Sequence, residues 1–225
     1  MSETIGLSIR VAFIATCINL ILAIGIARLL SNSYFKGKGI LESLFVLPMV
    51  LPPSVTGFIL LRLLGRHGFI GIWLDQIWGV KMLFTWQATV IAAVVVSFPL
   101  MYQSCKAAFM SVDRSVENVA RTLGANEWRV FWKVGLPLAF PTIVSGIVLT
   151  FARALGEFGA TLMIGGNIAG ETRTIPIAIF FANESGNNQM ATTLTWIVVL
   201  YGFVTIYALN HWMKAQNKGA VNNND

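Results

Sequence analysis

The stretch "ENVARTLGANEWRVFWKVGLP", residues 117–137, is a polar insert between two long apolar segments of the chain. Asp113 ahead of it and Asn126 within it are residue types that cap helix N-termini. Gly124 lies between them and is the residue type that most often ends a helix in the left-handed conformation. The pattern therefore predicts two short amphipathic helices, one on either side of Gly124. The apolar face of the first helix is formed by Val116, Val119, Ala120 and Leu123.

The composition of the whole chain indicates a membrane protein. The chain has 225 residues, of which 12% are charged and 56% are hydrophobic, and its mean hydropathy is +0.70. A soluble domain carries roughly 25% charged residues, so we expect an integral membrane protein of a single domain. The net charge of +6 follows from the membrane topology described below and does not require a nucleic-acid partner.

Five segments are apolar and long enough to cross a bilayer as helices, which takes about 20 residues. We therefore expect an all-α polytopic bundle in the plasma membrane, formed by residues 1–213, with the polar insert in a connecting loop at 110–137. The polar tail at 214–225 is expected to lack regular structure. The predicted spans are 7–30, 40–64, 83–109, 138–164 and 192–212.

The distribution of lysine and arginine predicts how the chain is oriented. Ten of the 16 basic residues lie on the side of the loop 110–137, five lie on the other side, and Arg153 lies within a span. Because basic residues are enriched in cytoplasmic loops, we expect this loop and the C-terminus in the cytoplasm. The N-terminus is then outside, since the number of spans is odd.

The sequence lacks the groups that would make the chain an enzyme by itself. It has no GxxxxGK[ST] phosphate loop, so it should not hydrolyse ATP. His67 and His211 have no cluster of cysteines or carboxylates around them, which argues against a metal site. The sequence therefore predicts no catalytic, cofactor or metal site.

Helix-breaking residues inside the second span mark a candidate translocation path or gate. Pro48, Pro52 and Pro53 lie in this span and are followed by Thr56. Each proline removes a backbone donor and clashes with the preceding turn of a helix. One interpretation is a kink needed for packing. The other is a discontinuous helix that faces the path, since such a break survives in lipid only inside protein or along a cavity.

Arg153 and Glu157 are two further candidates for the path, in the fourth apolar segment. A charge in mid-membrane costs about 2.5–3.5 kcal/mol on insertion scales, and the i, i+4 spacing places both on one helical face. They form either an ion pair that locks this helix against its neighbours or a pair that lines a polar path. Gly156 and Gly159 beside them favour close packing or a local break.

The polar insert resembles the loop of ABC-transporter permeases that has the pattern E-A-A-x3-G-x9-I-x-L-P. In that family the loop forms the coupling helix that sits in a groove of the ATPase subunit. Gly124 matches the glycine of the pattern, and Asn118 takes the place of its glutamate, although Glu117 directly precedes it. The other matching positions are Val119, Ala120, Val134, Leu136 and Pro137.

The resemblance covers nearly the whole chain, through "LPMVLPPSVTGFILL", "GRHGFIG", "SFPLM", "FARALGEFGAT" and "GETRTIP". These stretches resemble the molybdate permeases within the molybdate, tungstate and sulfate branch. The resemblance implies a homodimer in membrane lipid, two ATPase subunits that bind ATP and Mg, and an extracytoplasmic oxyanion-binding protein. The alternatives are a sulfate/thiosulfate or tungstate permease of the same family and, in a different class, a stand-alone channel or secondary transporter.

Overall fold

The structure, a computed structural model, describes residues 1–31 and 35–222, without the side chains of residues 78, 210 and 214–222. Every element in these described residues is a helix. The elements are α1 (Ser2–Ser31), α2 (Lys38–Val50), α3 (Pro53–Leu64), α4 (Phe69–Trp78), α5 (Trp86–Ser111), α6 (Arg114–Thr122), α7 (Glu127–Val130), the π-helical turn η1 (Phe131–Gly135), α8 (Leu136–Leu155), α9 (Gly159–Gly165), α10 (Ile175–Glu184) and α11 (Asn188–Asn222).

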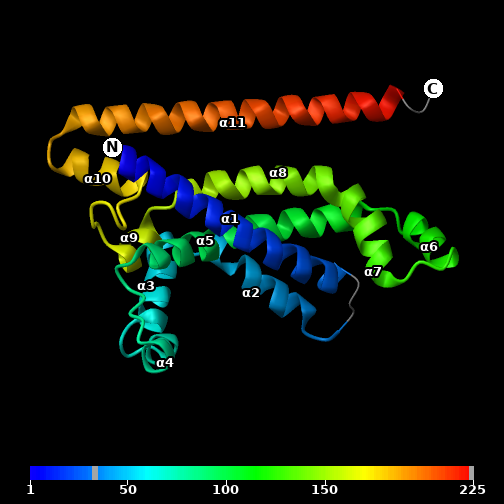
Figure 1. Cartoon of the computed structure of the whole chain (residues 1–225), viewed down its shortest axis with the longest axis horizontal. Helices are drawn as coiled ribbons and strands as arrows, with labels where there is room; N and C mark the ends of the chain where they lie inside the picture. Colours follow the sequence, from blue (N-terminus) through cyan, green and yellow to red (C-terminus); the bar gives the residue numbers. More distant parts are fainter. Residues whose placement is uncertain (32–34, 223–225) are drawn as a thin grey trace.

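The long helices form a bundle (Figure 1). In the part of the chain that the structure describes, four helices are each long and apolar enough to span a membrane, and the bent pair α2–α3 forms a fifth candidate span. α1, α5 and α8 pack against one another in the centre, α11 lies beside α8 and α10, and α2 lies against α5. The predicted all-helical membrane fold with about five spans is confirmed.

The two ends of the bundle carry different elements. In Figure 1 the start of α1, α9 and α10 lie at one end, from which α3 and α4 also project, while α6 and α7 lie at the other end. α11 runs back towards the end that carries α6 and α7. The start of α1 and the end of α11 therefore lie at opposite ends, as an odd number of spans requires. Which end faces the cytoplasm stays a prediction.

Small residues on α1 allow it to pack closely along α5. Ala12, Ala15, Ala23 and Ala27 are fully buried on α1, and small side chains let two helix backbones approach each other. The outer helices differ from this centre. No residue of α2 is buried. In the apolar stretch of α11 that could span a membrane, only 6% of the residues are buried. A single copy of the chain therefore leaves large apolar helix faces uncovered.

The fourth span differs from its prediction at both of its ends. The continuous helix starts at Glu127 and ends at Leu155, so the predicted second short helix of the insert and the start of the span are one helix. Pro137 does not interrupt it, because the wider turn η1 comes directly before: the N–H of Leu136 bonds to the carbonyl of Phe131, five residues back. The predicted helix after Gly124 is thus present, capped by Asn126, but it continues into the fourth span and does not end before it.

The polar tail is also more regular than its composition suggests. α11 continues as a helix to Asn222, through most of the stretch for which no regular structure is expected. Adding a residue to an existing helix needs no new nucleation, so a span can propagate into a polar sequence. Residues 223–225 lie outside the described residues.

Candidate functional site

Local capping residues form the first helix of the insert, as the sequence predicts. α6 begins after Asp113, whose carboxylate accepts a hydrogen bond of 2.8 Å from the backbone N–H of Ser115. This bond lowers the pKa of the Asp113 carboxyl below its usual value. Gly124 follows the helix with a left-handed φ of +83°, and its N–H donates to the carbonyl of Arg121. The predicted cap and stop are confirmed.

Large apolar side chains of the insert remain exposed within the chain. Their exposed fractions lie between 45% and 82%. Trp128 and Trp132 pack edge to face, with ring centroids 5.5 Å apart. Exposed apolar patches of this kind are typical of sites that contact another protein. We call this set the insert surface: Val116, Val119, Leu123, Trp128 and Trp132.

The last residues of the family pattern lie where the insert joins the fourth span. Asn126 caps α7, with its side-chain oxygen accepting a hydrogen bond of 2.9 Å from the N–H of Arg129. Val134 lies in η1, and Leu136 and Pro137 open α8. The part of the insert surface formed by Trp128 and Trp132 is thus continuous with α8, because α7, η1 and α8 follow one another without a break.

The two candidate residues at the glutamate position of the pattern lie in different environments. Asn118 is exposed, and its side-chain oxygen accepts a hydrogen bond of 2.8 Å from Arg121. Glu117 is 5% exposed and forms ion pairs of 2.8 Å with Arg28 of α1 and 3.2 Å with Arg121. Sequence reasoning missed Arg28, which it used only to count charges.

The second span is a discontinuous helix. The chain bends by 113° between α2 and α3. Pro48 lies inside α2 without ending it, Pro52 is the N-cap of α3, and Pro53 is the first residue of α3. Thr56 is buried, and its hydroxyl has no hydrogen-bond partner among the described residues. The break agrees with the second interpretation of the prolines, while a role of these four residues in a path stays a prediction.

The second and fourth spans, both of which are broken, contact each other next to this bend. α3 packs against α9, the short helix that follows the break at residues 156–158. A Cβ atom on Gly159 would lie 2.8 Å from Cβ of Pro53, and one on Gly57 would lie 2.8 Å from Cβ of Met163. The lack of side chains at both glycines therefore permits this close crossing.

Arg153 and Glu157 form the ion pair that their spacing suggests. The distance from Nη1 of Arg153 to Oε2 of Glu157 is 2.8 Å. The helix ends at Leu155, so Glu157 lies in the break, where its Oε1 accepts a hydrogen bond of 2.9 Å from the N–H of Ala160 in α9. The Glu157 side chain is 2% exposed, and that of Arg153 is 36% exposed. The pair thus joins the end of α8 to the start of α9.

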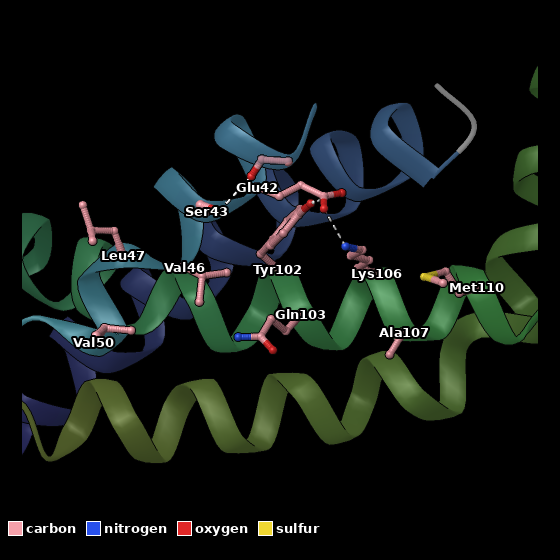
Figure 2. Close-up of a pocket in the computed structure, with 11 residues that line it drawn as sticks. Glu42, Ser43, Val46, Leu47, Val50, Tyr102, Gln103, Lys106, Ala107 and Met110 are labelled. Atoms are coloured by element: carbon pink, nitrogen blue, oxygen red, sulfur yellow. Dashed lines mark hydrogen bonds and ion pairs between the residues drawn. The ribbon is translucent and has the colours of Figure 1, made fainter. Parts of the chain in front are cut away.

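A groove between α2 and α5 contains a further charge pair (Figure 2). It has a volume of about 850 Å³ and is walled mainly by apolar side chains. Nζ of Lys106 lies 2.9 Å from Oε2 of Glu42, and the hydroxyl of Tyr102 donates to Oε1 of Glu42 at 3.4 Å. Sequence reasoning missed this cluster, although Glu42 and Lys106 are charges inside predicted spans and the cost of such charges would have drawn attention to them.

The described residues contain no group of three or more His, Cys, Asp or Glu side chains that could hold a metal ion. Cys105 is buried and Cys17 is exposed, and neither forms a disulfide. The chemistry that this part of the chain offers is therefore that of ion pairs, helix breaks and an exposed apolar surface.

Comparisons with known proteins agree with this architecture. The family described as "Binding-protein-dependent transport system inner membrane component" matches residues 8–220. The chain is 42% identical over 212 residues to the molybdenum transport system permease protein ModB of Escherichia coli K12, covering 94% of this chain and 92% of that protein. It is 34% identical over 200 residues to the sulfate transport system permease protein CysW of Synechococcus elongatus, covering 89% of this chain and 68% of that protein.

Solved structures share the fold at lower sequence identity. A chain of the MetNI methionine ABC transporter, in inward-facing conformations, has a TM-score of 0.70 at 15% identity, covering 96% of this chain and 95% of that chain. A chain of a bacterial alginate ABC transporter in complex with a periplasmic protein has a TM-score of 0.73 at 18% identity, covering 93% and 76%. Because the family model matches residues 8–220, the chain belongs to the binding-protein-dependent transport system inner membrane components.

Proposed function

We propose that the chain is the permease subunit of an ABC importer that moves molybdate across the plasma membrane, driven by ATP hydrolysis in a separate subunit. The ModB relative, a molybdenum transport system permease protein, supports molybdate as the substrate, because it matches 94% of this chain at 42% identity. The permease contributes the path and the ATPase contact, and it needs no catalytic group of its own.

The observation that carries this proposal is the insert surface. It exposes apolar side chains on a short capped helix and on the helix that leads into α8. Gly124 and the closing residues of the insert resemble the coupling loop of ABC permeases. This resemblance identifies the ATPase subunit as the partner that would bind the exposed surface. ATPase subunits that bind ATP and Mg would cover it and push on it.

The other partners follow from the same arrangement. A second copy of the chain would form a homodimer with the path between the copies, and lipid would cover the remaining apolar faces of the outer helices. With the insert in the cytoplasm, the connections at 65–82 and 165–191 would meet an oxyanion-binding protein outside. The alginate transporter solved with a periplasmic protein is an example of such a contact in a related fold.

Two alternatives remain as outcomes of the test. The sulfate relative CysW, at 34% identity, makes sulfate or thiosulfate the first alternative substrate, with tungstate as another. A stand-alone channel or secondary transporter would give the insert surface nothing to bind.

The test is uptake of labelled molybdate into vesicles that contain the permease, its ATPase subunits and its binding protein. We expect uptake that requires ATP and is inhibited more by unlabelled molybdate than by equal sulfate. Stronger inhibition by sulfate or tungstate than by molybdate would assign that ion as the substrate in place of molybdate. Uptake that continues without the ATPase subunits would contradict the proposed function.

A further inference from the structure

α6 is attached to the spans through one buried side chain. Among the nine residues of α6, all of them described, only Glu117 is buried. α6 packs mainly against α7 and η1, the elements that follow it in the chain. Apart from its connection to α5 through residues 112 and 113, the attachment of α6 to the bundle therefore depends mainly on what Glu117 contacts.

Glu117 contacts the first span. Its Oε1 accepts a hydrogen bond of 2.8 Å from Nη1 of Arg28, and the side chains of the pair are 6% and 15% exposed. The Arg28 guanidinium also lies 5.8 Å from the ring centroid of Phe109 and 5.7 Å from that of Phe131, within the range of cation–π attraction. Four elements, α1, α5, α6 and η1, therefore meet at this one cation.

The surroundings leave the pair little room to move. Gly135 is buried beside it, and a Cβ at this position would lie 2.9 Å from Oε1 of Glu117 and 3.7 Å from Nη1 of Arg28. When one partner of a buried ion pair is lost, the other charge stays buried without compensation. The same loop has a contrasting pair, Arg121 with Glu127, in which the Glu127 side chain is 70% exposed. Such exposed pairs contribute little.

The buried pair adds a direct contact between α6 and α1 to the covalent connections of α6 with α5 and α7. A displacement of the insert surface reaches α8 directly, because α7, η1 and α8 form one continuous helix. It reaches α1 through Glu117 and Arg28, which are 89 residues apart in the sequence, in addition to the packing of α1 against α5 and α8. α1 in turn packs along α5 and α8, so a movement of α1 is passed to the centre of the bundle.

We propose that Arg28 and Glu117 are positioning residues that transmit displacement of the insert surface to α1. The inference rests on the proposed function, in which an ATPase subunit pushes on that surface. Glu117 is the only carboxylate on α6, and it is turned towards the spans. Its task is then the coupling inside the permease, while the exposed Asn118 and the insert surface remain free to contact the partner.

The test uses the complete transporter, with its ATPase subunits and binding protein, in lipid vesicles. Glu117→Gln is expected to lower the number of molybdate ions taken up per ATP hydrolysed by about tenfold, within the range of measured couplings between sites. The amount of ATPase subunit that co-purifies should stay the same. The exchanged pair Arg28→Glu with Glu117→Arg should recover part of the ratio. Glu127→Gln, which removes only the exposed pair of the loop, is the matched control and should leave the ratio unchanged.

Three outcomes would overturn the proposal, two of them in the transport assay. An unchanged ratio in Glu117→Gln means that the pair transmits nothing, and loss of the ATPase subunit from the complex means that Glu117 acts in docking instead. Amide hydrogen exchange of the permease alone adds a measurement that needs no transport. Faster exchange in α6, with α1 and α5 unchanged, is expected for Glu117→Gln but not for Glu127→Gln, and equal exchange would overturn the proposal.

The unaltered transporter separates this inference from the proposed function. If it takes up no molybdate in an ATP-dependent manner, the proposed function fails. The hydrogen-exchange comparison then still decides whether the pair attaches α6 to α1.

Discussion

At the crossing of α3 and α9, helix backbones touch through Gly57 and Gly159, whereas at the opposite end α6 is attached through the single buried carboxylate of Glu117. In the first region, atoms of the same chain leave no room for an added Cβ at either glycine. The second leaves large apolar side chains exposed for another protein to cover. Changes at the crossing should therefore alter the stability of the permease, while changes in the insert should alter how ATP hydrolysis is coupled to transport.

The largest expected effect is that of Arg153→Gln, beside the crossing. It leaves Glu157 buried with only the N–H of Ala160 as a partner. Breaking a buried pair costs about 3–5 kcal/mol, and we expect the low end because this N–H remains and because the Arg153 side chain is 36% exposed. The midpoint of unfolding of the purified permease in detergent measures the loss.

The double variant Arg153→Gln with Glu157→Gln is the control for this prediction. It should be more stable than Arg153→Gln alone, since no buried charge is left and a glutamine oxygen can still accept from Ala160. Additive losses in the double-mutant cycle would mean that the two charges do not stabilise each other.

The next largest effect is expected for Gly57→Ala, which tests how tightly the crossing is filled. The added Cβ would lie 2.8 Å from Cβ of Met163 and 2.9 Å from Cα of Ala160. Overpacking of this kind costs about 1–3 kcal/mol, so the unfolding midpoint should fall. Gly25→Ala in α1 is the matched control, because its Cβ would meet nothing within 4 Å. Equal midpoints for the two variants would contradict a close crossing.

Gly124→Val should affect the coupling of ATP hydrolysis to transport more than the stability of the permease. A residue with a Cβ in the left-handed conformation costs about 1–2 kcal/mol, and a Cβ added at Gly124 would meet nothing within 4 Å. We expect normal amounts of protein in the membrane and a lower ratio of molybdate uptake to ATP hydrolysis. Gly124→Asn, which tolerates this conformation, should stay close to the unaltered protein. Unchanged uptake in Gly124→Val would show that the stop after α6 does not matter for coupling.

The insert was predictable where its structure depends on neighbouring residues. The cap at Asp113, the stop at Gly124 and the cap at Asn126 each need only a side chain and the next few backbone groups. The fusion of the second short helix with α8 was not predictable in this way. Pro137 normally marks a helix start or break, and only the wider turn η1 lets the helix continue through it.

The contacts that attach these elements depend on distant residues. Arg28 and Glu117 are 89 positions apart, and Gly57 contacts Met163 across two breaks in the spans. No periodic pattern in one segment specifies which partner it meets. The charges of Glu42 and Lys106 inside predicted spans were visible in the sequence, but their pairing across α2 and α5 needed the fold.

The smallest expected effect concerns the cap of α6. Asp113→Ala removes the acceptor for the N–H of Ser115, so the first turn of α6 should exchange its amide hydrogens faster, while Asp113→Asn keeps a capping oxygen and should not. The pKa of Asp113 is lowered in the folded protein, so its contribution is complete above the unfolded pKa of about 3.9 and is lost only as the pH falls through the folded value. The ratio of exchange rates between Asp113→Ala and the unaltered protein should therefore stay constant from about pH 6 to pH 8, well above that range. A ratio that changes over this interval would mean that another titrating group, and not the Asp113 carboxylate, holds the start of α6.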